Sequence, residues 1–139
     1  MDQVYFLKDS SRLKEVSSKI FQDFYPSSSE VLIKIHFGEV GNKTALTPKD
    51  IQPLTEAFAS QKNKLTFFDT CVMYRSPRNN PLTHKILAKT KGWGKLGKIK
   101  IGQDFQTFKA KDLEVEAAED LIKAKNVLVI SHVKGHPLA

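Results

Sequence analysis

Apolar runs typical of buried strands alternate with segments at helical spacing along this chain of 139 residues. Runs at residues 31–37 and 65–69 flank a segment in which Ile51, Leu54 and Phe58 recur on one helical face. Strands separated by helices of about a dozen residues form βαβ units, whose strands lie parallel in one sheet. This alternation predicts an α/β fold with a mainly parallel or mixed sheet and helices on both faces.

The remaining elements follow from the same spacing rules. We expect strands at residues 4–7, 31–37, 65–69, 99–101 and 126–132, and helices at residues 13–24, 47–61, 81–91 and 113–125. Ser10 or Ser11 is expected to cap the first helix, and Pro48 after Thr47 to begin the second. Residues 105–110 fit either a strand or one arm of a hairpin.

The length of the chain and the few residues after its last predicted strand indicate how many domains it forms and whether the fold is covered. A chain of this size buries about two thirds of its unfolded surface, so it needs no disulfide or metal in order to fold. An α/β domain usually follows its last core strand with a covering helix, but here only a few residues remain. We therefore expect residues 1–139 to be a single α/β domain without a C-terminal covering element, as an incomplete version of a longer domain or a piece completed by another chain.

Cysteine content and hydropathy indicate a compartment. Cys71 is the only cysteine, so no intramolecular disulfide can form. No apolar run approaches the roughly 20 residues that span a bilayer, and the N-terminus lacks a signal-peptide pattern. We expect a cytoplasmic protein that does not enter a membrane.

Basic residues concentrate in one part of the sequence. The whole chain has 22 Lys and Arg against 15 Asp and Glu, a formal net charge of +7. Residues 70–103 contain no acidic residue but eight basic ones: Arg75, Arg78, Lys85, Lys89, Lys91, Lys95, Lys98 and Lys100. Such a stretch predicts an anionic partner, which is a phosphate, a carboxylate, nucleic acid or an acidic protein surface. A solvated lysine-rich face is the other interpretation.

Histidine and lysine recur where the predicted core strands end. Lys34 and His36 are two residues apart, so both side chains emerge from one face of their strand. His132 and Lys134 repeat this spacing after the last strand, and Asp69 ends a strand that lies between them in sequence. Ligands of open α/β sheets bind outside the carboxyl ends of the strands. We therefore expect these five residues to line a crevice, with the two histidines as acid–base groups and the aspartate orienting one of them.

Simpler interpretations exist for each of these residues taken singly. A strand-end histidine often only hydrogen-bonds to neighbouring backbone, and a lysine there reaches water along its stem. A loop could bring His36, His132 and His136 to one metal ion, but the nearby lysines would repel a cation, so metal binding stays open. Cys71 is either a thiol with a lowered pKa or a small buried side chain, and we favour the second interpretation.

Two glycine-rich segments match nucleotide-binding motifs only superficially. Residues 92–97 fit GxGxxG, but they follow a helix and precede a strand, whereas the dinucleotide fingerprint requires the reverse order. Residues 38–44 lack the spacing of a P-loop. The backbone N–H groups of that loop are still candidates to cradle an anion.

Taken together, these motifs resemble the family catalogued as domain of unknown function 362. The resemblance rests on VLIKIHFGE-x-GNKT at residues 31–44, FDT at residues 68–70, Tyr74, and SHVKGH at residues 131–136, and it extends to the last residue. The positions that match the pattern of the family are Lys34, His36, Gly38, Gly41, Asn42, Thr44, Asp69, Arg78, Asn79, His84, His132, Lys134, Gly135 and His136.

What the resemblance implies is modest, because the activity of the family is itself unsettled. Its members are often described as ferredoxin-like or iron–sulfur-associated proteins, and many carry a separate cysteine-rich 4Fe–4S module. Since Cys71 is the only cysteine here, such a cluster would require segments or a redox partner protein that this sequence does not include. Members also continue into a Gly-rich stretch and a helix, which supports the expectation that this domain is truncated at its C-terminus.

We therefore expect an enzyme-like domain that binds a small anionic ligand at the carboxyl ends of the strands. Lys34, Lys134 and Arg78 would be its charge partners, and the further ligand-binding candidates are Gly38, Gly41, Asn42, Thr44, Asn79, His84 and His136. The alternative is a basic module that binds nucleic acid or an acidic protein, with Tyr74 and Trp93 as stacking surfaces. Self-association is also expected if one face of the sheet is uncovered.

Overall fold

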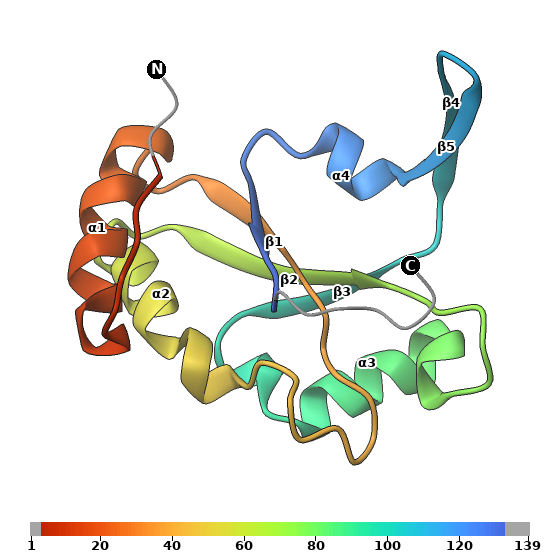
Figure 1. The fold of residues 1–139 in the computed structure, drawn as a ribbon, viewed down its shortest axis with the longest axis horizontal. Coiled ribbons are helices and arrows are strands. Elements are labelled where there is room, and N and C mark those ends of the chain that lie inside the picture. The colour runs from red at the N-terminus through yellow and green to blue at the C-terminus, as the bar shows by residue number, and fades with distance from the viewer. Residues whose placement is uncertain (1–3, 133–139) are drawn as a thin grey trace.

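The computed structural model describes residues 4–132 and confirms the α/β class (Figure 1). One sheet holds four parallel strands in the order β3-β2-β1-β6, and a separate antiparallel pair holds β4 and β5. The strands are β1 (Glu30–Ile35), β2 (Lys64–Thr70), β3 (Lys98–Gly102), β4 (Phe105–Ala110), β5 (Leu113–Ala118) and β6 (Val127–Ile130). The helices are α1 (Leu13–Phe24), α2 (Pro48–Ser60), α3 (Pro81–Thr90) and α4 (Glu119–Lys123), with short 3-10 turns η1 (Ser10–Arg12), η2 (Pro77–Asn79) and η3 (Trp93–Lys95).

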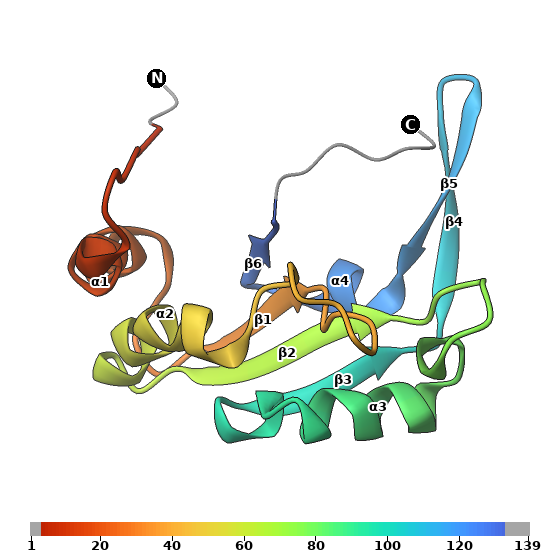
Figure 2. The ribbon, with the colours of Figure 1, turned by 60° about the horizontal axis from the view of Figure 1, so that its bottom comes forward.

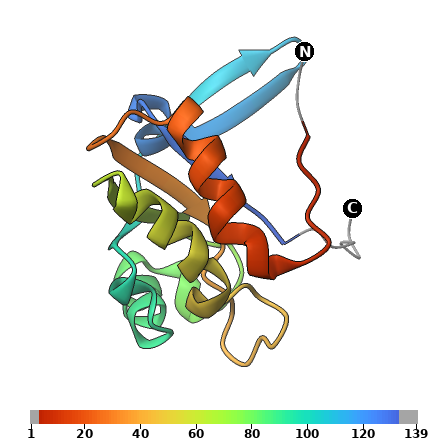
Figure 3. The ribbon, with the colours of Figure 1, turned by 90° about the vertical axis from the view of Figure 1, so that its left-hand side faces the viewer.

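The core lies on one face of the four-stranded sheet. Ile33, Phe67 and Ile99 occupy matching register positions on β1, β2 and β3, and all three are buried. They pack against α2 and α3 and against Trp93, which is fully buried. Helix α1 lies beside α2 and stacks the ring of Phe21 on that of Phe58 (Figure 3).

The opposite face of the sheet is covered by a single short helix. Leu32, Thr66 and Lys100 alternate with the core residues, and together with residues of α4 they line a hollow. Lys100 also pairs with Asp120 of α4. The prediction of helices on both faces is therefore confirmed, although the second layer is thin.

Local capping sets where two of the helices begin. The Thr47 hydroxyl accepts from the Asp50 N–H, and the Asp50 carboxylate accepts from the Thr47 N–H, which forms a capping box with Pro48 at the first helical position. The Asn80 side chain accepts from the first N–H groups of α3, and Pro81 follows it. Both helix starts agree with the sequence prediction.

Three local predictions are wrong. Residues 4–7 form no strand in the structure. The first turn is capped by Asp9, whose carboxylate accepts from the Ser11 N–H, rather than by a serine. Residues 113–118 form β5 instead of the first half of a helix, and they pair with β4 as a hairpin that stands away from the other elements (Figure 2). Among residues 4–132 no helix is long and apolar enough to cross a bilayer.

Gly97 allows the chain to enter β3 close to β2. A Cβ atom at this position would lie 2.7 Å from the Leu65 carbonyl oxygen, and backbone cannot move aside as a flexible side chain can. We expect Gly97→Ala to lower the free energy of unfolding by about 1–2 kcal/mol through this overlap. Urea denaturation checks this, with Gly94→Ala as a control for losing a glycine, since a Cβ at that position would meet only ordinary van der Waals contacts, 3.7 Å from Ile99 Cδ1 and 3.8 Å from Lys89 Cγ. Equal losses in the two variants would contradict the steric explanation.

The strand order reverses beside β1. From β1 the chain proceeds outward through β2 to β3, and it then returns to place β6 on the other side of β1. In open parallel sheets the loops leaving two such strands diverge, which opens a crevice at their carboxyl ends.

Candidate functional site

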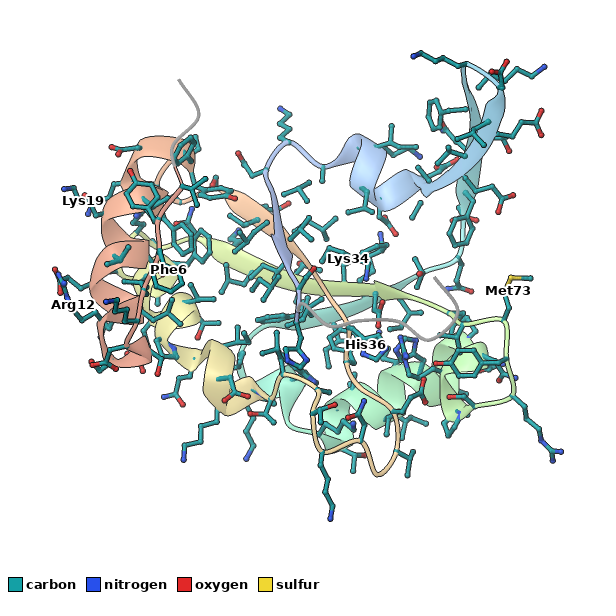
Figure 4. All side chains as sticks on the ribbon, in the orientation of Figure 1. Phe6, Arg12, Lys19, Lys34, His36 and Met73 are labelled. Carbon is teal, nitrogen blue, oxygen red and sulfur yellow. The ribbon has the colours of Figure 1, made fainter. Side chains whose placement is uncertain are left out.

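A pocket of about 330 Å³ lies at the carboxyl ends of β1 and β6, where the strand order reverses. Two strands and the loop between β1 and α2 supply its walls. Its lining residues are Lys34, Ile35, His36, Asn42, Thr44, Ala45, Leu46, Val129, Ile130, Ser131 and His132. Figure 4 shows Lys34 and His36 near the end of β1. The strand-end residues of β1 and β6 thus face one shared pocket.

The structure brings some of the predicted site residues to the pocket and places others elsewhere. Lys34, His36, Asn42, Thr44 and His132 line the pocket. Asp69, Arg78 and His84 are buried, and Gly38 and Gly41 lie in the loop that follows β1 with positive φ angles. Asn79 lies exposed in η2 and lines a different hollow. Lys134 and His136 fall outside the described residues.

Arg78 is the centre of the buried group. Its side chain is only 2% exposed, and it contacts two carboxylates and two imidazoles. Nη1 donates to Glu39 Oε1 at 2.7 Å and lies 2.5 Å from His36 Nε2, Nη2 donates to Asp69 Oδ2 at 2.9 Å, and Nε donates to His84 Nε2 at 3.2 Å. A buried guanidinium is tolerated only when it is paired in this way. Arg78 therefore lies behind the pocket and does not line it.

Asp69 joins the pocket lysine to this buried group. Its carboxylate accepts from Lys34 Nζ at 2.9 Å, from Arg78 Nη2, and from the backbone N–H of Phe37 and Thr70. Burial alone would raise the pKa of Asp69, but His84, the Lys34 ammonium and the Arg78 guanidinium outweigh it and hold the pKa well below its usual range. Asp69 is thus an ionised partner of two cations and has no hydrogen bond to His36 or His132.

Both ring nitrogens of His36 face N–H donors. Nδ1 accepts from the Gly38 N–H at 3.0 Å, and Nε2 faces Arg78 Nη1. A neutral imidazole has one lone pair, so either tautomer satisfies only one of these contacts, and a protonated ring would satisfy neither. Burial and the adjacent Arg78 charge lower the pKa of His36 accordingly. This geometry favours a neutral ring that is held in place.

Glu39 is a member of the group that the sequence analysis missed. Its carboxylate accepts hydrogen bonds from Tyr74 at 2.5 Å, from Ser76 at 2.7 Å and from Arg78 at 2.7 Å. Burial by itself raises the pKa of Glu39, but these three hydrogen bonds and the Arg78 charge lower it to about 2. Lys91 Nζ donates to the Glu39 carbonyl. Glu39 therefore ties the loop after β1 to the loop after β2 and to the end of α3.

Asn42 shapes the loop wall of the pocket. Its Oδ1 accepts from the Thr44 N–H, the Thr44 hydroxyl and the Ala45 N–H, which fixes the orientation of the amide. The opposite end of that amide, Nδ2, has no partner among residues 4–132. It is therefore free to donate to a ligand.

The basic stretch is partly used inside the molecule. Arg78 and Lys100 form ion pairs, and Lys91 bonds to a backbone carbonyl. Trp93 is fully buried, so it cannot provide the stacking surface that the nucleic-acid alternative assigned to it. Tyr74 is exposed, but its hydroxyl is bonded to Glu39.

The residues present do not fit an iron–sulfur cluster. A 4Fe–4S cluster takes four thiolates, and Cys71 is the only cysteine in the sequence. Burial raises the pKa of the Cys71 thiol, whereas a reactive cysteine would have a lowered pKa. Within residues 4–132 no three His, Cys, Asp or Glu side chains are grouped to hold a metal ion.

A larger hollow of about 750 Å³ lies elsewhere, between α2 and η3. Lys49, Glu56 and Lys95 are among its lining residues, but no histidine is. Because it is away from the strand ends and from the buried charged group, we assign the candidate site to the smaller pocket at β1 and β6.

Comparison with known proteins gives a family. The family described as Domain of unknown function (DUF362) matches residues 31–139. The match begins one residue after the start of β1 and includes every element that contributes to the pocket. No match was found among curated proteins or among solved structures.

Proposed function

The chain belongs to the DUF362 family, whose function is unknown, and we propose a function from the geometry of the chain itself. We propose that it is an enzyme-like domain that binds a small anionic ligand in the β1–β6 pocket. The observation that carries this proposal is the composition of the pocket wall. Lys34 lines it from β1 and His132 from the segment that follows β6, and none of the described lining residues is acidic. A concave site with a few convergent donors is the usual form of a small-molecule site.

Lys34 is the residue that would contact the anion. Its ammonium has three N–H donors, and Asp69 uses one of them. Asp69 is in turn held by Arg78, so the ammonium is fixed at the pocket wall while two donors stay available for the ligand.

His132 is the group we propose for proton transfer. It lies exposed at the pocket after β6, and imidazole is the side chain that most often acts as a general acid or base. His36 faces the same pocket, but Arg78 and Gly38 occupy its ring nitrogens, so we assign it a positioning role.

Two other hypotheses have less support. An iron–sulfur association would have to come from a partner protein, because the chain lacks the thiolates. The nucleic-acid or acidic-protein module retains five basic residues of the stretch at the surface, namely Arg75, Lys85, Lys89, Lys95 and Lys98, but loses Trp93 as an aromatic contact.

Replacing Lys34 tests the anion site. In titrations with sodium acetate, followed by NMR chemical shifts, we expect Lys34→Met to weaken binding at least tenfold, or about 1.4 kcal/mol, because the pocket loses the only lysine among its described lining residues. Lys100→Met is the matched control, since Lys100 lies on the same face of the sheet, two strands away, and pairs with Asp120. If both variants bind acetate as the wild type does, the anion does not occupy this pocket.

A further inference from the structure

We infer that the ligand of this pocket is an organic carboxylate with an apolar body, and that it is neither inorganic phosphate nor a nucleotide. This inference rests on the proposed anion site and names the chemical class that the site would take. Three observations carry it: the charge of the pocket, the start of the helix that follows its loop wall, and the apolar part of its wall.

The cationic groups on the described wall of the pocket suit a ligand with a single negative charge. Lys34 is the only Lys or Arg among the described lining residues, and its ammonium lies 2.9 Å from the Asp69 carboxylate. Arg78, the next nearest cation of the group, is buried and already paired with Asp69 and Glu39. A phosphate dianion would thus meet one partly compensated cation, whereas a carboxylate needs no more than that.

The helix that follows β1 is closed to phosphate. Phosphate sites in α/β folds use free N–H groups at a helix N-terminus. At the N-terminus of α2, however, the Asp50 carboxylate accepts from both the N–H and the hydroxyl of Thr47. A carboxylate fixed at this position satisfies the terminal donor and repels a second anion.

Part of the pocket wall is apolar. Ala45 and Leu46 line it from the loop, and Val129 and Ile130 line it from β6. Val129 lies directly opposite Lys34 in the strand register and is 64% exposed, so its methyl groups are open to contact on the strand next to that of Lys34. An ammonium and exposed methyl groups in the lining of one pocket suit a carboxylate that carries a hydrocarbon chain.

Polar donors complete a carboxylate-sized site. The free amide end of Asn42 and the hydroxyl of Ser131 lie on the wall with Lys34. A carboxylate has two oxygens that accept from such donors. The volume of about 330 Å³ is at the small end of ligand pockets and suits a ligand of short chain length.

A chain-length series tests this inference on the intact chain. We would titrate acetate, butyrate, hexanoate and inorganic phosphate, and follow NMR resonances of Lys34, Ser131 and His132. The dissociation constant is expected to fall about fourfold for each methylene that the wall buries, and phosphate is expected to bind more weakly than hexanoate.

Two matched variants isolate the apolar wall. Val129→Thr keeps the size of the side chain and adds a hydroxyl, so we expect it to remove part of the gain from acetate to hexanoate. Val115→Thr makes the same change on the exposed face of β5 and is expected to leave the series unchanged.

The outcomes separate this inference from the proposed function. If acetate binds at these resonances but longer chains gain nothing, or if phosphate binds there more tightly than hexanoate, the ligand class is wrong and the anion site stands. If no probe moves these resonances, the proposed function itself fails.

Discussion

Replacing Arg78 with methionine is expected to lower the free energy of unfolding by about 3–5 kcal/mol, because it leaves buried carboxylates without their partner. Asp69 is 2% exposed and loses the Arg78 cation while it keeps Lys34, and Glu39 loses its ion pair with Arg78. The His36 and His84 rings lose the same donor. Urea denaturation at pH 7 measures the loss.

Two further variants make the Arg78 result interpretable. Arg75→Met removes an exposed arginine from the same loop and is expected to change stability by less than about 0.5 kcal/mol. Arg78→Lys keeps the charge but cannot reach four groups at once, so an intermediate loss is expected. If Arg78→Met unfolds at the urea concentration of the wild type, the guanidinium is not what stabilises this group.

Acid is expected to destabilise the protein through Glu39. The pKa of Glu39 is about 2 in the folded chain, below the ordinary value of 4.5. A carboxyl group with a lowered pKa stabilises the fold fully above its unfolded pKa, and this contribution disappears as the pH falls through the folded pKa. Because 27% of the side chain is exposed, we discount the effect for solvent screening to about 2 kcal/mol.

Glu39→Gln checks this pH dependence. The variant is expected to be less stable than the wild type by about 2 kcal/mol at pH 7. Between pH 4.5 and pH 2 the difference is expected to shrink, since the wild type loses the same contribution there. Glu114→Gln on the exposed edge of β5 makes the same charge change and is expected to have no such effect. A difference between Glu39→Gln and the wild type that stays constant from pH 7 to pH 2 would contradict this assignment.

The fold was largely predictable because strand and helix signals in this chain are local. Thr47 and Pro48 begin α2 as expected, and the alternation around Ile33 places β1. The failure at residues 113–118 has a clear cause. Glu and Ala favour helices by composition, but Leu113 and Val115 alternate with Glu114 and Glu116, which is the spacing of a strand.

The site was predictable only in part. Lys34, His36 and His132 could be placed at one sheet edge because strand direction and spacing determine which end and which face they occupy. The roles of Arg78 and Glu39 could not, because their contacts join two loops whose conformations no periodicity specifies. The sequence does show a glutamate in the loop after one predicted strand and an arginine in the loop after the next, and this opposite charge was the only indication that the two side chains could pair.

Strand β6 forms one wall of the pocket, and its register with β1 is the shortest in the four-stranded sheet. Four residues hold this outer strand against β1, while β1 and β2 share a longer register. Brief detachment of that strand would remove one wall and withdraw Leu128 and Ile130 from the edge of the core, and such local openings cost less than global unfolding. We therefore expect ligand affinity at the proposed site to depend on how often the edge of the sheet opens as well as on the contacts that the ligand makes.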